Sequence, residues 1–209
     1  MTSSFSPLAT RRRFLAGSGA ACLLGGCSPL LGGKDPPHLY TLQPATSFAP
    51  DLPTVRAQLA VATPQAAQSL DIERIVLAHS PTSFDYFADA AWADRTPMMI
   101  QGLLVESFEN SGRIQAVGRD SGDVRADSLL QTELRNFEAR YDSPDQPPQI
   151  IIRIGVKLIK VPDRRMVGTM NAEGQGKADR NDITSIVTAF NDTLGPVLRQ
   201  IVEWSLRRL

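Results

Sequence analysis

Cysteine is scarce in this chain, at two of 209 residues. Both cysteines, Cys22 and Cys27, lie near the N-terminus, so the sequence after them contains neither a disulfide nor a thiol nucleophile. A domain that follows Cys27 must therefore be stabilised by packing alone.

The chain also has few histidines and no net charge. The only histidines, His38 and His79, cannot form a three-histidine metal site, and no Gly-x-Ser-x-Gly nucleophile motif is present. We therefore predict no catalytic residue, no metal and no cofactor. The 22 basic and 22 acidic residues balance, which gives no electrostatic argument for a nucleic-acid partner. The aspartates between Asp120 and Asp127 could serve an envelope hydrolase, but turn capping and solvated charge explain them better.

Long apolar runs are also missing, since no segment approaches the roughly 18 consecutive apolar residues of a membrane-spanning helix. The first 26 residues lack Asp and Glu and place three arginines (11–13) before a short apolar run (14–24). This layout predicts a signal peptide over residues 1–26. Its end, Leu-Gly-Gly-Cys at 24–27, resembles a lipobox, in which the cysteine receives a diacylglycerol with fatty acids such as palmitate. Cys27 is therefore the predicted lipidation site.

Two export routes remain open. Thr-Arg-Arg-Arg-Phe-Leu at 10–15 resembles a twin-arginine signal, but Ala16 replaces the usual lysine, and a general secretory signal fits as well. Ser28 follows the cysteine where an inner-membrane lipoprotein would carry Asp. We therefore expect a lipid anchor on the periplasmic face of the outer membrane. Residues 27–37 are rich in Gly and Pro and predict a lipidated tether, with the fold starting at residue 38.

Periodicity predicts a mixed α/β domain. Thr96 is the predicted cap of a helix whose apolar residues follow helical spacing from Met99 to Phe108 and which ends at Gly112. A second helical stripe follows Asn181 or Asp182 as the cap. Strand-like segments cover residues 39–42, 57–63, 74–78, 83–88 and 114–118, with a hairpin formed by 150–158 and 166–174. Two such helices would cover a sheet of five or six strands.

Residues 128–141 fit two structures. Leu130, Leu134, Phe137 and Tyr141 fit one face of a helix, but the same segment fits a strand whose alternation switches phase once, as at a β-bulge. Periodicity alone leaves both open.

One aromatic group stands out as a candidate contact with a partner or a lipid. It comprises four side chains close in sequence: Phe84, Tyr86, Phe87 and Trp92. Such a group lies more often in the core of a domain than on a binding surface.

The sequence resembles the ABC-type transport auxiliary lipoproteins, the family of the PqiC and YmbA lipoproteins. The resemblance covers nearly all of residues 38–209 and depends on the order of four short motifs. They are His-Leu-Tyr-Thr-Leu at 38–42, Leu-Asp-Ile-Glu-Arg-Ile at 70–75, Tyr-Phe-Ala-Asp-Ala-Ala-Trp-Ala-Asp at 86–94, and Phe-Glu-Ala at 137–139 before the hairpin and final helix. Ala90 and Ala91 depart from the family pattern, in which an Arg often precedes the Trp.

This resemblance implies a three-layer α/β/α sandwich with a mixed sheet, similar to the N-terminal domain of TolB, and a strand at 128–141. It also implies a non-catalytic accessory to a lipid-moving ABC or MCE-type system that carries phospholipid or sterol-like molecules. The expected partners are an MCE-domain protein, ABC transporter subunits and further copies of the chain in a homo-oligomer. The alternative is an outer-membrane assembly or envelope-integrity lipoprotein without a transport partner.

Overall fold

A computed structural model describes residues 36–121 and 125–209 of the chain. Cys27, the signal peptide and most of the predicted tether lie outside the described residues. In the described ranges, no helix is both long and apolar enough to cross a membrane.

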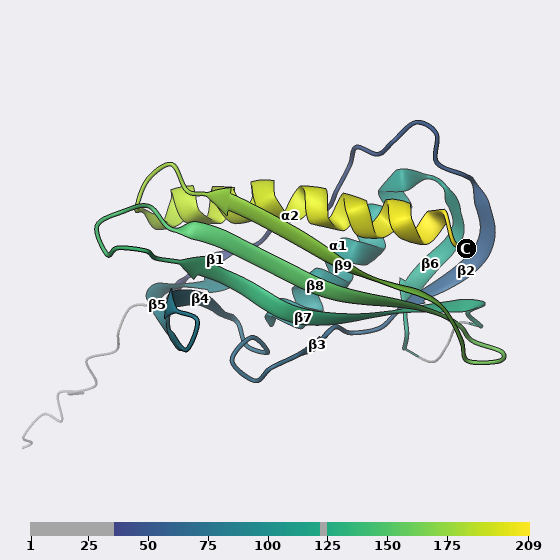
Figure 1. Ribbon diagram of the computed structural model, residues 1–209, viewed down its shortest axis with the longest axis horizontal. Coiled ribbons are helices and arrows are strands. Elements are labelled where there is room, and N and C mark those ends of the chain that lie inside the picture. The colour runs from purple at the N-terminus through teal and green to yellow at the C-terminus, as the bar shows by residue number, and fades with distance from the viewer. Residues whose placement is uncertain (1–35, 122–124) are drawn as a thin grey trace, which may run out of the picture. The chain divides into compact units, whose positions relative to one another are not determined.

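The described chain is a mixed α/β domain with strands and helices in an irregular order (Figure 1). The elements are β1 (His38–Tyr40), β2 (Val55–Val61), β3 (Gln65–Ala66), β4 (Arg74–Ser80), β5 (Ser83–Trp92), α1 (Thr96–Ser111), β6 (Ile114–Arg119), β7 (Ser128–Arg140), β8 (Gln149–Lys160), β9 (Arg165–Lys177) and α2 (Ile183–Leu206).

Three long antiparallel strands, β7, β8 and β9, form the main part of the sheet. The β8–β9 hairpin confirms the prediction from alternation. The strand at 128–141 is also confirmed, and its phase switch is a bulge: Leu134 pairs with Ile154 and Asn136 with Arg153, so Arg135 is the extra residue. Side chains at 130 and 134 before the bulge and at 137 and 139 after it are all buried, as the switch requires.

The other edge of β7 is shared by three parallel strands. β2 pairs with its start, β3 with its middle and β4 with its end. β4 also pairs with β5, and β5 pairs with β1, whereas β2 also pairs with β6. The sheet therefore has two branches on this side of β7. The described residues form a sheet of nine strands, so the predicted count of five or six was too low. β1 and β3 have only three and two residues, too few for alternation to reveal.

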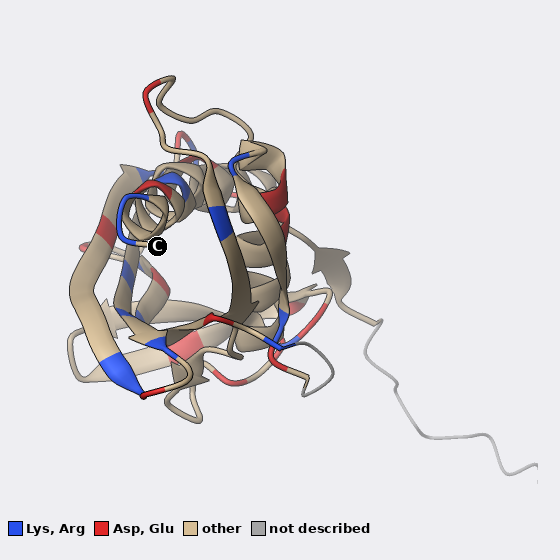
Figure 2. Cartoon of the chain, turned by 90° about the vertical axis from the view of Figure 1, so that its right-hand side faces the viewer, with Lys and Arg blue, Asp and Glu red and all other residues tan. Residues whose placement is uncertain are grey.

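The two helices lie on the same face of the sheet, and the sheet curves around them (Figure 2). One core cluster joins both helices to the inward side chains of β7 and β8. On the opposite face of the sheet, Arg153, Lys157 and Glu173 are exposed. The described residues therefore form two layers, and the expected third layer is absent from them because this face is polar. The likeness to TolB stays a prediction.

Glycines on β9 allow α2 to approach the sheet closely. A Cβ atom at Gly174 would lie 2.7 Å from Val197 Cγ2, and one at Gly176 would overlap the hydroxyl of Thr193. A Cβ at Gly168 would lie 3.3 Å from the indole of Trp204. Because these three positions face α2, side chains there would push the helix off the sheet.

Candidate functional site

Three of the predicted family motifs meet in space. β1, from the first motif, pairs with β5 in the register His38–Ala90 to Tyr40–Trp92. The backbone N–H of Trp92 donates to the carbonyl of Glu73 at 2.6 Å, which joins the third motif to the second. Segments far apart in sequence thus form one junction where β5 leads into α1.

The start of α1 is fixed to this junction by polar contacts. Arg95 forms an ion pair with Asp71, and the Thr96 hydroxyl donates to the Ile72 carbonyl at 3.1 Å. The capping residue of α1 is Arg95, and its side chain makes no capping bond. Pro at the helix start removes one N–H that would otherwise need a partner. The backbone N–H of Thr96 donates to the Ile72 carbonyl at 3.1 Å, so a backbone carbonyl from another segment satisfies a donor at the helix start.

Trp92 belongs to the core and not to a contact surface. Its side chain is 1% exposed and packs edge-on against Phe137 and Phe190, with ring centroids 5.8 and 5.3 Å away. The sequence placed Trp92 among the candidate contact residues, and the structure removes it because β5 turns this side chain toward α2.

The other three aromatic residues lie on β5 near the β4–β5 turn, and we call this segment the aromatic edge: Phe84, Tyr86 and Phe87. Phe84 is 48% exposed and meets the half-buried Tyr86 edge to face, with 5.8 Å between ring centroids. The guanidinium of Arg74 lies over the Tyr86 ring, 4.5 Å from its centroid. Phe87 is also half-buried. Contacts with Tyr86 and Arg74 hold the aromatic edge in place, and the Phe84 ring stays partly exposed to solvent. A contact of this edge with a partner or a lipid stays a prediction.

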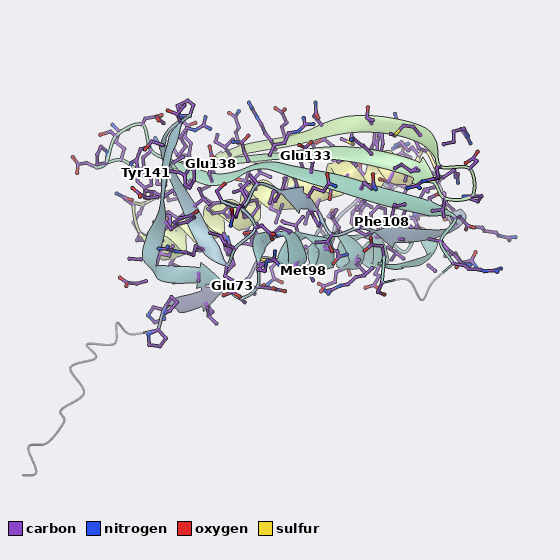
Figure 3. The ribbon with its side chains drawn as sticks, turned by 90° about the horizontal axis from the view of Figure 1, so that it is seen from below. Glu73, Met98, Phe108, Glu133, Glu138 and Tyr141 are labelled. Carbon is purple, nitrogen blue, oxygen red and sulfur yellow. The ribbon has the colours of Figure 1, made fainter. Side chains whose placement is uncertain are left out.

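A second site on the exposed face of the sheet was missed from the sequence. The bulge directs Arg135 across Gly155, where its guanidinium donates to Glu133 Oε2 at 3.0 Å and to Asn171 Oδ1 at 2.9 Å. A Cβ at Gly155 would lie 2.9 Å from the Arg135 guanidinium, so glycine leaves the room. These residues line a cavity of about 470 Å³. The phase switch in the sequence predicts a bulge but not this arrangement. Glu133 and Glu138 mark the course of β7 in Figure 3, and Tyr141 follows the end of the strand.

Three titratable groups of the described domain have a pKa shifted by structural contacts or burial. A hydrogen bond from the backbone N–H of Ser185, helped by Arg180, lowers the pKa of Asp182, which caps α2. A hydrogen bond from Arg207 lowers the pKa of Asp51. Burial raises the pKa of Tyr141.

One aspartate of the acidic loop between Asp120 and Asp127, which was considered for a hydrolase, makes a structural contact. Asp127 accepts the backbone N–H of Gln58 at 2.9 Å, and residues 122–124 lie outside the described residues. No group of three or more metal-ligating side chains gathers within residues 36–121 and 125–209.

The described residues thus define a mixed α/β domain whose conspicuous features are a motif junction, an aromatic edge and a bulged polar site. The family described as the ABC-type transport auxiliary lipoprotein component matches residues 40–202, and the chain belongs to it. The description of this family is that of an auxiliary component of ABC-type transport. Lipidation at Cys27, outside the described residues, stays a prediction.

Two solved structures are similar to the chain in fold. The crystal structure of protein XCC0632 from Xanthomonas campestris has a TM-score of 0.76 at 29% identity, with 82% of this chain and 95% of that chain covered. The hypothetical protein CT253 from Chlamydia trachomatis, at 8% identity, shares the fold with a TM-score of 0.51, covering 74% and 98% of the two chains.

A longer relative is known by sequence. The uncharacterized protein bll6063 from Bradyrhizobium diazoefficiens is 27% identical over 188 residues, which are 88% of this chain and 49% of that protein. The chain therefore spans about half the length of this relative.

Proposed function

We propose that this protein is a non-catalytic lipoprotein of an MCE-type lipid transport system, anchored through acylated Cys27 on the periplasmic face of the outer membrane. In this role the folded domain holds an MCE-domain protein, and through it the ABC subunits, at the membrane that receives or delivers the lipid. Phospholipid or a sterol-like molecule is the expected cargo. Further copies of the chain join in a homo-oligomer.

Membership in the auxiliary family is the observation that carries this proposal. The predicted signal peptide, the lipobox and Ser28 support the anchor. The aromatic edge supports docking, because Phe84 combines a half-exposed ring with a support fixed by Tyr86 and Arg74. An aromatic side chain that is already held in place loses little conformational entropy when a partner covers it.

The test is affinity purification of the tagged full-length protein from membranes of its own host, with co-purifying proteins identified by mass spectrometry. Wild type and Cys27→Ala are compared. We expect both to recover an MCE-domain protein, while only wild type incorporates labelled palmitate and sediments with the outer membrane. Recovery of no MCE or ABC subunit with either protein would refute the transport role. An acylated wild type would then still keep the lipoprotein assignment.

A matched pair of variants tests the aromatic edge. Phe84→Ser and Met166→Ser each remove one exposed apolar side chain, 48% and 49% exposed, from different ends of the domain. Phe84→Ser should reduce recovery of the MCE-domain protein, and Met166→Ser should leave it unchanged. Equal recovery with both variants would exclude the aromatic edge as the docking surface.

A further inference from the structure

The turn between β8 and β9 combines exposed apolar side chains with basic ones. Val161 is 41% and Met166 49% exposed, and they are two of the four large hydrophobic side chains exposed in the described part of the chain. Lys160 precedes them, and Arg164 lies between them with a left-handed φ of 50°. We call residues 160–166, together with the adjacent Arg56, the basic turn.

The cations of the basic turn are mostly uncompensated. Arg56, Lys160 and Arg164 form no ion pair within the described residues. Of the acidic groups nearby, Asp163 pairs with Arg165 at 3.4 Å, and Asp127 accepts a backbone N–H but keeps its charge. Four cations of the described residues (Arg56, Lys160, Arg164 and Arg165) thus stand against these two carboxylates. A cleft of about 530 Å³ opens among Arg56, Asp127, Lys160, Asp163 and Arg165. The surface is therefore positive in a sequence that, without the three N-terminal arginines, is mildly acidic.

The basic turn lies at the end of the domain opposite the aromatic edge. Lys160 pairs with the first residue of β7, Ser128, whereas Ala78, just before the β4–β5 turn, pairs with the last, Arg140. Thirteen residues of β7 separate the two ends by roughly 40 Å at about 3.3 Å per residue. Figure 1 shows β1, where the chain enters the domain, near the β4–β5 end, and the C-terminus near the other.

We propose that the basic turn is a second membrane contact of this protein, which docks on a bilayer rich in anionic phospholipid. Val161 and Met166 enter the headgroup region, where the apolar area that they bury adds to the binding. Arg56, Lys160 and Arg164 face the lipid phosphates, to which an anionic surface attracts cations.

A bilayer fits this surface better than a protein partner does. The apolar part consists of two separate side chains on a turn and not of a continuous patch of several hundred Å², the size that a stable protein interface buries. Charge complementarity with phosphate supplies the remaining attraction. The contact does not depend on the transport partner, so it can fail while the proposed function stands, and the reverse.

The experiment uses residues 36–209, because the whole core cluster lies between Leu42 and Leu206 and all described strand pairings lie within this range. Co-sedimentation is measured with vesicles of phosphatidylcholine alone and with a 3:1 mixture of phosphatidylcholine and phosphatidylglycerol. We expect binding to the mixed vesicles only, weakening as salt is raised. The triple variant Arg56→Gln/Lys160→Gln/Arg164→Gln should lose about fivefold in affinity per cation, or about 100-fold in total.

The matched control neutralises three exposed cations outside the basic turn, Arg153→Gln/Lys177→Gln/Arg199→Gln, and should retain most of the binding. A second readout fixes the orientation. Residues 36–209 contain no cysteine, so Val161→Cys and Phe84→Cys each carry one environment-sensitive fluorophore. The label at 161 should shift to the blue on mixed vesicles, and the label at 84 should not. Absence of binding, equal loss in both triple variants, or a shift at 84 alone would each overturn the proposal.

Discussion

The close packing of α2 on β9 can be tested at a single glycine. In Gly176→Ala, the added Cβ overlaps the Thr193 hydroxyl. That side chain is 6% exposed, and its hydroxyl donates to the Ala189 carbonyl at 2.7 Å, so it has little freedom to move. Overpacking of this kind costs about 1–3 kcal/mol. Alanine returns about 0.5–1 kcal/mol because glycine loses more backbone entropy in a strand. A net destabilisation of about 1–2 kcal/mol is expected.

A double-mutant cycle separates this clash from other effects of the substitution. Thr193→Ala removes the overlapping hydroxyl, and the next atom, Thr193 Cβ, lies at 3.5 Å from the added methyl, an ordinary contact. In the Thr193→Ala background, Gly176→Ala should therefore be neutral or slightly stabilising, with a coupling of about 1–3 kcal/mol between the two sites.

The measurement is urea unfolding of residues 36–209, with the midpoint compared at an unchanged slope. Gly118→Ala is the matched control, because a Cβ at this strand position meets nothing within 4 Å, and it should not destabilise. If Gly176→Ala costs the same with and without Thr193, then α2 does not approach β9 as described, and the reasoning is wrong.

Three further changes probe the core, the helix cap and the bulged site. Trp92→Ala should cost about 3–5 kcal/mol in urea unfolding, and a loss below 1 kcal/mol would place the indole outside the core. The lowered pKa of Asp182 means that its carboxylate stabilises the fold above an unfolded pKa of about 3.9 and loses this contribution as pH falls through the lower folded pKa. Asp182→Asn keeps a capping oxygen but removes the charge, so it should destabilise at pH 7, and its difference from wild type should shrink on acidification; a difference independent of pH would contradict a contribution from the charge. Gly155→Val should displace the guanidinium of Arg135 at a cost of about 1 kcal/mol or less, since a half-exposed side chain can move away; its Nε–H resonance should shift in NMR spectra, and an unchanged resonance would contradict the placement over Gly155.

Much of the fold follows from local patterns in the sequence. The alternation in β8 and the helical stripe in α2 predict their elements because each buries one face over many residues. Asp182 was one of two predicted caps, and its carboxylate accepts the N–H of Ser185 at 2.9 Å. The predicted cap of α1, Thr96, was wrong, because its hydroxyl instead donates to Ile72, 24 residues earlier in sequence. Such a contact depends on tertiary neighbours.

The candidate site could be predicted only in part for the same reason. Phe84, Tyr86 and Trp92 share a phase on β5, yet Trp92 is buried and Phe84 exposed. The pairing of β4 with β5 shifts between Arg74–Ala91 and Val76–Tyr86, so one strand contains an irregularity that breaks the alternation. Alternation in a sequence assigns each side chain to one face of the sheet relative to its near neighbours. It does not show where a bulge adds residues and so reverses the assignment.

The bulge at Arg135 links the local pattern of β7 to the architecture of the whole domain. Before the bulge, the edge of β7 opposite β8 pairs with β2 and β3. After the bulge, the same edge pairs with β4. A bulge increases strand twist, so the extra residue turns the edge from the branch containing β6 toward the branch containing β5 and β1. The first branch adjoins the basic turn, since β2 pairs with the start of β7, and the second contains the aromatic edge. Arg135, which lines the polar site on the exposed face, therefore also lies at the point of β7 between the two surfaces proposed for a bilayer and for a protein partner.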